Sequence, residues 1–98
     1  MFGLIGKFTT HPGKRDDLLA ILVQAAEELK SNDGCISYVV GTSDDPNAIW
    51  VTEVWTDKAA HVASLEPQEV RDLISQAMPL IAAISDQTEL AIAGGKGV

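Results

Sequence analysis

The chain has 98 residues, of which 46% are hydrophobic and 21% charged, and its net charge is −7. This length and composition indicate one globular domain and exclude a disordered chain. The seven Lys and Arg residues cannot easily form the basic surface that nucleic acid or an anionic membrane requires, so neither is an expected partner.

Targeting signals and disulfides are also not expected. No apolar run approaches the ~18 residues that a membrane-spanning helix needs. The first seven residues, up to Lys7, lack the basic region and cleavage site of a secretory signal. The single cysteine, Cys35, excludes an internal disulfide and fits a reducing compartment. We therefore expect a cytoplasmic protein.

The chain begins with a strand followed by a helix. Residues 2–10 alternate large apolar side chains with smaller ones, which predicts a half-buried strand. Residues 14–30 change to the helical period, with Asp16 and Asp17 near the start, as the helix dipole favours. Gly34 is expected to follow this helix in the left-handed conformation.

Two strands come next and form a predicted antiparallel hairpin. Residues 35–42 and 49–55 are rich in β-branched and aromatic side chains, and a short turn joins them. In the second strand, Glu53 and Trp55 share one face while Trp50 lies on the other. Which of the two tryptophans points to the pocket stays open.

A split helical region follows the hairpin. Asp57 can cap a short helix over residues 58–64, and Pro67 suits the first position of the next helix. The apolar stripe of that helix continues to Ile81, and Pro79 is expected to kink the helix or tighten its last turn.

The last strand is predicted at residues 89–93, so the domain covers residues 1–93 and residues 94–98 form a flexible tail. The order β-α-β-β-α-β predicts an α+β, ferredoxin-like antiparallel sheet with its helices on one face. The opposite face is bare and apolar, and we expect a second copy to cover it. Two sheets packed in this way would form a dimeric α/β barrel.

Five segments of the chain carry a family pattern in a fixed order. They are Thr10-His11-Pro12-Gly13-Lys14, Gly34-Cys35-Ile36-Ser37-Tyr38, Asp45-Pro46-Asn47, Glu53-Val54-Trp55 and Ala59-Ala60-His61-Val62-Ala63-Ser64. This set resembles the antibiotic biosynthesis monooxygenase family over nearly the whole chain. The resemblance implies a homodimer with a pocket between sheet and helices in each subunit. It also implies, for some members, oxygenation of phenolic polyketides or quinols without flavin, metal or haem.

Other members of the family degrade haem, and that activity is not expected here. The haem-degrading pattern has an asparagine on the first strand and a tryptophan and a histidine on helices. This chain has Gly6-Lys7, His61 and Ile74 at about those places.

Three side chains are candidates for catalysis. His61 can take a proton from a phenol near neutral pH, or it can simply hydrogen-bond a neighbouring loop. Glu53 can act as a base if it is unpaired in the pocket, or it can form an ion pair with Lys7 or Arg71. For both residues the sequence favours the structural role. Tyr38 can supply a hydrogen-bond donor.

The aromatic residues are candidates for binding a flat substrate. Phe8, Trp50 and Trp55 can stack on a planar ligand, although aromatics at strand spacing more often form plain core. No metal site is expected, because His11, His61 and the one thiol show no ligand spacing. We expect a cofactor-independent monooxygenase of a small planar phenol or quinol. The alternative is a non-catalytic dimeric domain that binds a small apolar ligand.

Overall fold

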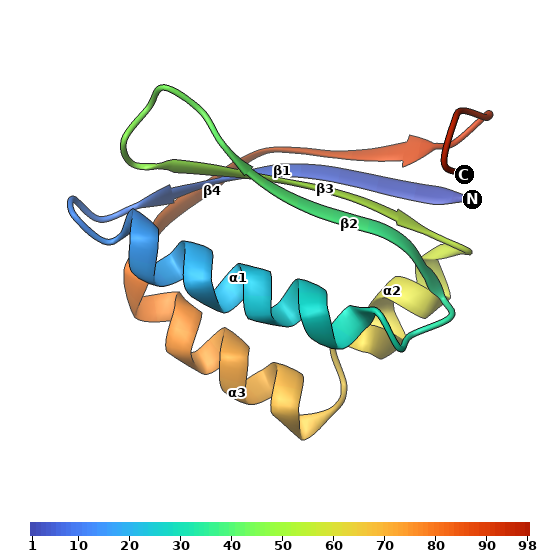
Figure 1. Cartoon of the computed structure of the whole chain (residues 1–98), viewed down its shortest axis with the longest axis horizontal. Coiled ribbons are helices and arrows are strands. Elements are labelled where there is room, and N and C mark those ends of the chain that lie inside the picture. Colours follow the sequence, from blue (N-terminus) through green and yellow to red (C-terminus); the bar gives the residue numbers. More distant parts are fainter.

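Four strands form a single antiparallel sheet in the order β2-β3-β1-β4. The computed structural model describes all residues 1–98. In Figure 1 every helix lies on the same side of this sheet. The elements are β1 (Phe2–Thr10), α1 (Arg15–Leu29), β2 (Cys35–Thr42), β3 (Ala48–Trp55), α2 (Lys58–Ser64), α3 (Gln68–Ala77), the 3₁₀ turn η1 (Met78–Leu80) and β4 (Ile81–Ala91). The α+β, ferredoxin-like prediction is confirmed.

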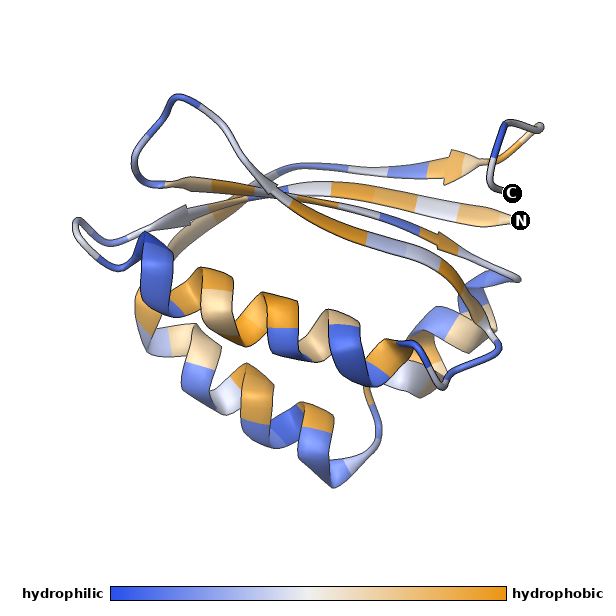
Figure 2. Ribbon diagram, in the orientation of Figure 1, coloured by the Kyte–Doolittle hydropathy of each residue, from blue (hydrophilic) through white to orange (hydrophobic).

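The core lies between the sheet and the helices α1 and α3. Strand alternation turns Ile49 and Val51 of β3 towards the helices, where they meet Leu18 and Leu22 of α1 and Ala77 of α3. Figure 2 shows hydrophobic segments on both the helices and the strands that face them, while hydrophilic segments alternate with them along the helices and also occupy the loops. The predicted apolar stripe of the first helix is thus the face that packs on the sheet.

The end of α3 and the start of β4 differ from the prediction. The helix ends at Ala77, and Pro79 lies in the following 3₁₀ turn, so the predicted tightening at Pro79 is confirmed. Ile81 already has extended backbone and begins the strand, which we predicted only from residue 89. Pairing explains the longer strand, because β4 lies beside β1 from Thr10 back to Phe2 and satisfies backbone groups along its length.

The turn after α1 also differs. Gly34 does not have the positive φ expected of a glycine that follows a helix. A Cβ atom at this position would lie only 2.9 Å from the Cβ of Ala60 in α2. Glycine is required here because the loop and α2 approach each other closely.

The sheet face that points away from the helices is not covered by any helix or strand (Figure 1). Val39 on β2 is 55% exposed there and Leu90 on β4 is 38% exposed. For both residues, the adjacent residue of the strand pairs with a residue that points to the helices. Because successive side chains of a strand point to opposite faces of the sheet, Val39 and Leu90 point away from the helices. Across all the helices, none combines the length and the apolar character that crossing a membrane would require.

Candidate active site

A cavity of about 860 Å³ lies between the helix-facing side of the sheet and the helices α1, α2 and α3. Of its 27 lining residues, 18 are hydrophobic. Both the volume and the mainly apolar wall are typical of sites for small organic ligands. The few polar side chains in the wall therefore decide what chemistry the cavity can support.

Glu53 is the polar centre of this cavity. Alternation along β3 turns it to the helix side together with Trp55. The indole Nε1–H of Trp55 donates a hydrogen bond of 3.0 Å to Glu53 Oε1. The Nε2 atom of His61 lies 3.7 Å from the same oxygen. The side chains of His61 and Glu53 are only 19% and 12% exposed, so solvent screens this pair less than a surface pair.

The expected ion pair of Glu53 with Lys7 or Arg71 does not form. Lys7 lies on the opposite face of the sheet, where its Nζ is 5.8 Å from the ring centroid of Trp50. Arg71 is exposed on α3 and forms no ion pair. The sequence showed that the carboxylate needed a partner, but the pairing of strands and the position of α2 determined which one it found.

The N-terminal cap of α2 fixes the position of His61. Asp57 caps this helix, as predicted, by accepting a 2.7 Å hydrogen bond from the backbone N–H of Ala60. The His61 ring lies 5.3 Å from the ring of Trp55 in an edge-on arrangement and 5.8 Å from the ring of Phe2. The imidazole therefore has two aromatic rings and the Glu53 carboxylate as neighbours.

Tyr38 lies beside this pair, because it is paired with Glu53 across β2 and β3. Burial, reinforced by the charge of Glu53, raises the pKa of the Tyr38 phenol. The hydroxyl thus keeps its proton, and it forms no hydrogen bond with another group of the protein. It is available to donate to a ligand.

The pKa of Glu53 is also raised. Burial is the main cause, and the hydrogen bond from Trp55 and the proximity of His61 only partly oppose it. The pKa of the nearby Cys35 thiol is raised by burial and by the charge of Glu53. A carboxyl group that holds its proton more tightly than usual is a better proton acceptor than an exposed one, which is what a general base requires.

The structure brings five of the six predicted site residues into the wall of this cavity: Phe8, Tyr38, Glu53, Trp55 and His61. The sixth, Trp50, does not line it, which corrects its predicted place in the binding site. Trp50 precedes Val51 on β3 and points to the open face of the sheet, where it contacts Lys7. The catalytic and binding roles of the five remain predictions.

One lining residue, Gln87 on β4, was not a candidate from the sequence. It lies in a β-bulge, where β1 residues Ile5 and Lys7 pair with Thr88 and Ser85. Asp86 in this bulge has a φ of 52°, which is rare for a residue other than glycine. Bulges redirect side chains next to binding sites. Residues 81–84 fit the period of a helix as well as that of a strand, so the sequence indicated only weakly that Gln87 lies on a strand.

No group of three or more His, Cys, Asp or Glu side chains lies close enough together to hold a metal ion. The polar groups gathered around Glu53 are its own carboxylate, an imidazole, a phenol and an indole N–H, in a cavity whose wall is mainly apolar. Together with the sheet order, this defines a ferredoxin-like domain with a buried acid–base pair in a ligand-sized pocket.

Comparison with known proteins identifies the family. The sequence model of the antibiotic biosynthesis monooxygenase family matches residues 1–76, so the chain belongs to this family. The matched region ends before β4 begins. Comparison with curated proteins gave no match.

Solved structures agree with this assignment. A protein from Chloroflexus aurantiacus J-10-fl that bears the family's name is 48% identical, with a TM-score of 0.88 over 96% of this chain and 94% of that one. Rv0793 from Mycobacterium tuberculosis is 22% identical, with a TM-score of 0.83 over 97% of each chain. PA3566 from Pseudomonas aeruginosa is 19% identical, with a TM-score of 0.84 over 95% of this chain and 94% of that one. The last two support the fold alone.

Proposed function

We propose that this protein is a cofactor-independent monooxygenase that oxidises a small planar phenol, quinol or related electron-rich ring with molecular oxygen. The observation that carries this proposal is the largely buried contact between Glu53 and His61 in the wall of a mainly apolar cavity. A buried carboxylate–imidazole pair can accept the proton that such a substrate must lose before it reacts with oxygen. Family membership supports the same type of reaction.

The overall reaction needs no electron donor besides the substrate. In an anthrone-type ring, a methylene group loses two hydrogen atoms and gains one oxygen atom as a carbonyl, and the second oxygen atom leaves as water. Removal of one proton first produces an electron-rich anion that can pass an electron to oxygen. The protein has to take that proton and keep bulk water away from the anion.

Each residue of the site has a separate role in this reaction. His61 accepts the proton, and Glu53 orients the imidazole and stabilises its charged form at 3.7 Å. Tyr38, whose hydroxyl retains its proton, donates a hydrogen bond to the substrate oxygen. Phe8 and Trp55 form the apolar wall against which the ring lies.

We also infer that two copies of the chain pair through the open sheet face, in the cytoplasm. Figure 1 supports this pairing, because that side of the sheet has no covering layer. The exposed Val39 and Leu90 would lose contact with water in such a dimer. The inferred assembly is a dimeric α/β barrel.

A non-catalytic domain that binds a small apolar ligand is the second candidate. It is favoured by the hydrogen bond from Trp55 to Glu53, because this bond and His61 already satisfy the buried carboxylate without any catalytic role. The apolar lining of the cavity would serve both functions equally well.

Oxygen consumption separates these two candidates. Purified protein is mixed with anthrone or 1,4-naphthohydroquinone, and the enzymatic rate is the excess over the spontaneous one. We expect His61→Ala to lower this rate by about 10²- to 10⁴-fold, the usual contribution of a general base, and to retain ligand binding. His11→Ala, at an exposed turn residue, is the matched control and should keep the full rate. Binding without any excess oxygen consumption in the parent protein would support the binding domain instead.

A further inference from the structure

The charged side chains that line the cavity are all acidic, apart from His61. They are Glu28 from α1, Glu53 from β3 and Glu69 from α3. None of the seven Lys and Arg residues of the chain lines the cavity. A ligand that enters therefore meets no permanent positive charge.

Cations on or near these elements lie outside the cavity wall. Arg71 is on α3 and makes no ion pair, but it is exposed and does not line the cavity. Lys30 forms an ion pair of 2.8 Å with Glu27, and Lys58 forms one of 2.9 Å with Glu89. Lys7 lies on the other face of the sheet. A small shift of a side chain would not bring Lys7 into the cavity, because the sheet itself lies between them.

His61 does not offset the excess of negative charge in the cavity wall. Its Nε2 lies 3.7 Å from Glu53, so a positive charge on the imidazole is already balanced by the carboxylate. A carboxylate or phosphate on the ligand would lose its hydration without gaining a cationic partner, and it would be repelled by the acidic side chains.

We propose that the cavity selects uncharged planar ring compounds and rejects those that carry a carboxylate or phosphate group, because its wall contains carboxylates and no lysine or arginine. This inference rests on the proposed function for the position of the site, and it narrows the substrate class. It concerns binding rather than turnover, so the two can fail separately.

The test uses two ligands of the same shape. The probes are 6-hydroxy-2-naphthamide and 6-hydroxy-2-naphthoic acid, which differ in charge but hardly in size. Their dissociation constants are measured by isothermal titration calorimetry at pH 7 without oxygen, so that no turnover occurs. We expect the amide to bind at least about tenfold more tightly, which corresponds to about 1.4 kcal/mol. Equal binding, tighter binding of the acid, or no binding of either probe at millimolar concentration would overturn the inference.

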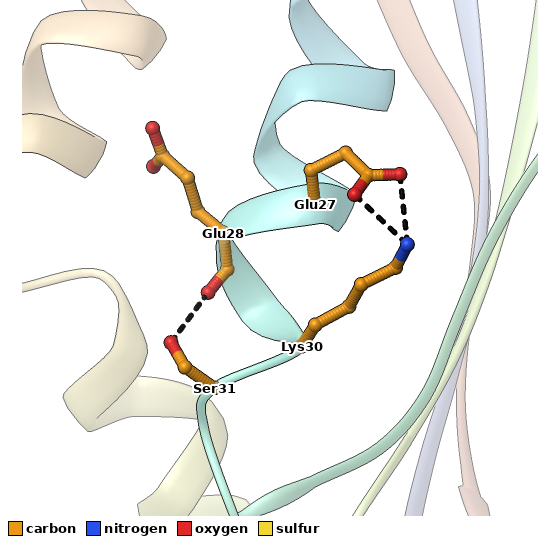
Figure 3. Close-up of polar contacts among 4 residues, drawn as sticks. All are labelled: Glu27, Glu28, Lys30 and Ser31. Atoms are coloured by element: carbon orange, nitrogen blue, oxygen red, sulfur yellow. Dashed lines mark hydrogen bonds and ion pairs between the residues drawn. The ribbon is translucent and has the colours of Figure 1, made fainter.

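A charge reversal in the wall gives a second measurement. Figure 3 shows the Glu28 side chain extending away from the Glu27–Lys30 pair at the end of α1. Glu28 lines the cavity and Glu27 does not, although both are exposed residues of the same helix. They therefore form a matched pair with the same change in net charge.

Glu28→Lys should bring the affinities of acid and amide closer together by about threefold or more, on the scale of a partly exposed charge pair. Glu27→Lys should leave their ratio unchanged. The same shift in both variants would mean that overall charge, and not the cavity wall, sets the selectivity, and this result would overturn the inference. Oxygen consumption by the parent protein with anthrone reports separately on the proposed function, because the binding measurements are made without oxygen.

Discussion

Glu53 connects the polar side chains of the cavity to one another. Its Oε1 atom accepts the Trp55 N–H bond and is the oxygen nearest to His61. Its charge contributes to the raised pKa values of both Tyr38 and Cys35. A change in the protonation of this one carboxyl group is therefore felt by all four neighbours.

Replacing Glu53 by glutamine should change how stability depends on pH. Burial raises the pKa of Glu53 in the folded protein above the ordinary value of 4.5. The protonated carboxyl thus contributes stability that is fully present below pH 4.5 and is lost as the pH rises through the raised pKa. Glu53→Gln cannot ionise, so the free energy of unfolding of the parent protein should fall relative to the variant from about pH 4.5 upwards and then level off.

Urea unfolding followed by tryptophan fluorescence measures this difference at a series of pH values. Glu89→Gln is the control, because Glu89 is exposed on β4 and pairs only with Lys58. Its difference from the parent should vary little over the same range. Parallel pH profiles for the parent and Glu53→Gln would contradict the assigned burial effect.

At the scale of elements, the position of α2 decides whether His61 reaches Glu53. This helix begins at the Asp57 cap and packs against the loop before β2, where Gly34 leaves room for Ala60. The absence of a side chain at Gly34 therefore helps to set the position of His61, although Gly34 itself does not line the cavity.

Gly34→Ala should move α2 and weaken the site. The added Cβ would lie 2.9 Å from Ala60 Cβ, closer than real Cβ contacts allow. We expect a loss of about 1–3 kcal/mol in the free energy of unfolding, as is typical of overpacking, together with weaker ligand binding. Gly94→Ala is the matched control, because nothing lies within 4 Å of a Cβ there and the residue follows the end of β4. A control variant as destabilised as Gly34→Ala would show that the loss of glycine in itself, and not the contact with α2, is responsible.

The hairpin and the first helix could be predicted from the sequence because their periodicity is regular. The start of β4 could not, since Ile81 and Ile84 are three residues apart and continue the helical stripe. The bulge at Asp86 then interrupts the alternation that would have indicated a strand. A second irregularity, in β2, pairs Cys35 with Trp55 but Ser37 with Val54. Cys35 and Ser37 therefore point to opposite faces of the sheet.

The same division holds for the site. The two-residue period placed Glu53 and Trp55 on one face, which needs only the sequence of one strand. Their contacts with His61 and Tyr38 depend on how β2 pairs with β3 and where α2 lies. Such distances between elements are set by packing, and a single sequence does not encode them in any local pattern.

At the scale of the whole molecule, the sheet has one covered face and one open face (Figure 1). A cavity of about 860 Å³ takes space that a small domain would otherwise use for core packing. Pairing through the open face would recover apolar burial on the other side of the sheet. Stability and ligand binding would then both depend on the dimer.

Val39→Lys should break this dimer. Val39 is 55% exposed at the open face, and a lysine there would have to bury its charge between two sheets without a partner. We expect the parent protein to sediment as a dimer at micromolar concentration and the variant to sediment as a monomer with a lower melting temperature.

The control is Val23→Lys, which makes the same change on α1 at a residue that is 46% exposed and does not line the cavity. It should remain a dimer, because its position is on the helical side of the molecule. A parent protein that sediments as a monomer would contradict the proposed pairing. If both variants stay dimeric, the copies associate through another surface, and the exposure of Val39 and Leu90 needs a different explanation. Since the cavity lies on the helix side of the sheet, a monomeric Val39→Lys that still binds the naphthamide probe would show that the pocket forms within one chain.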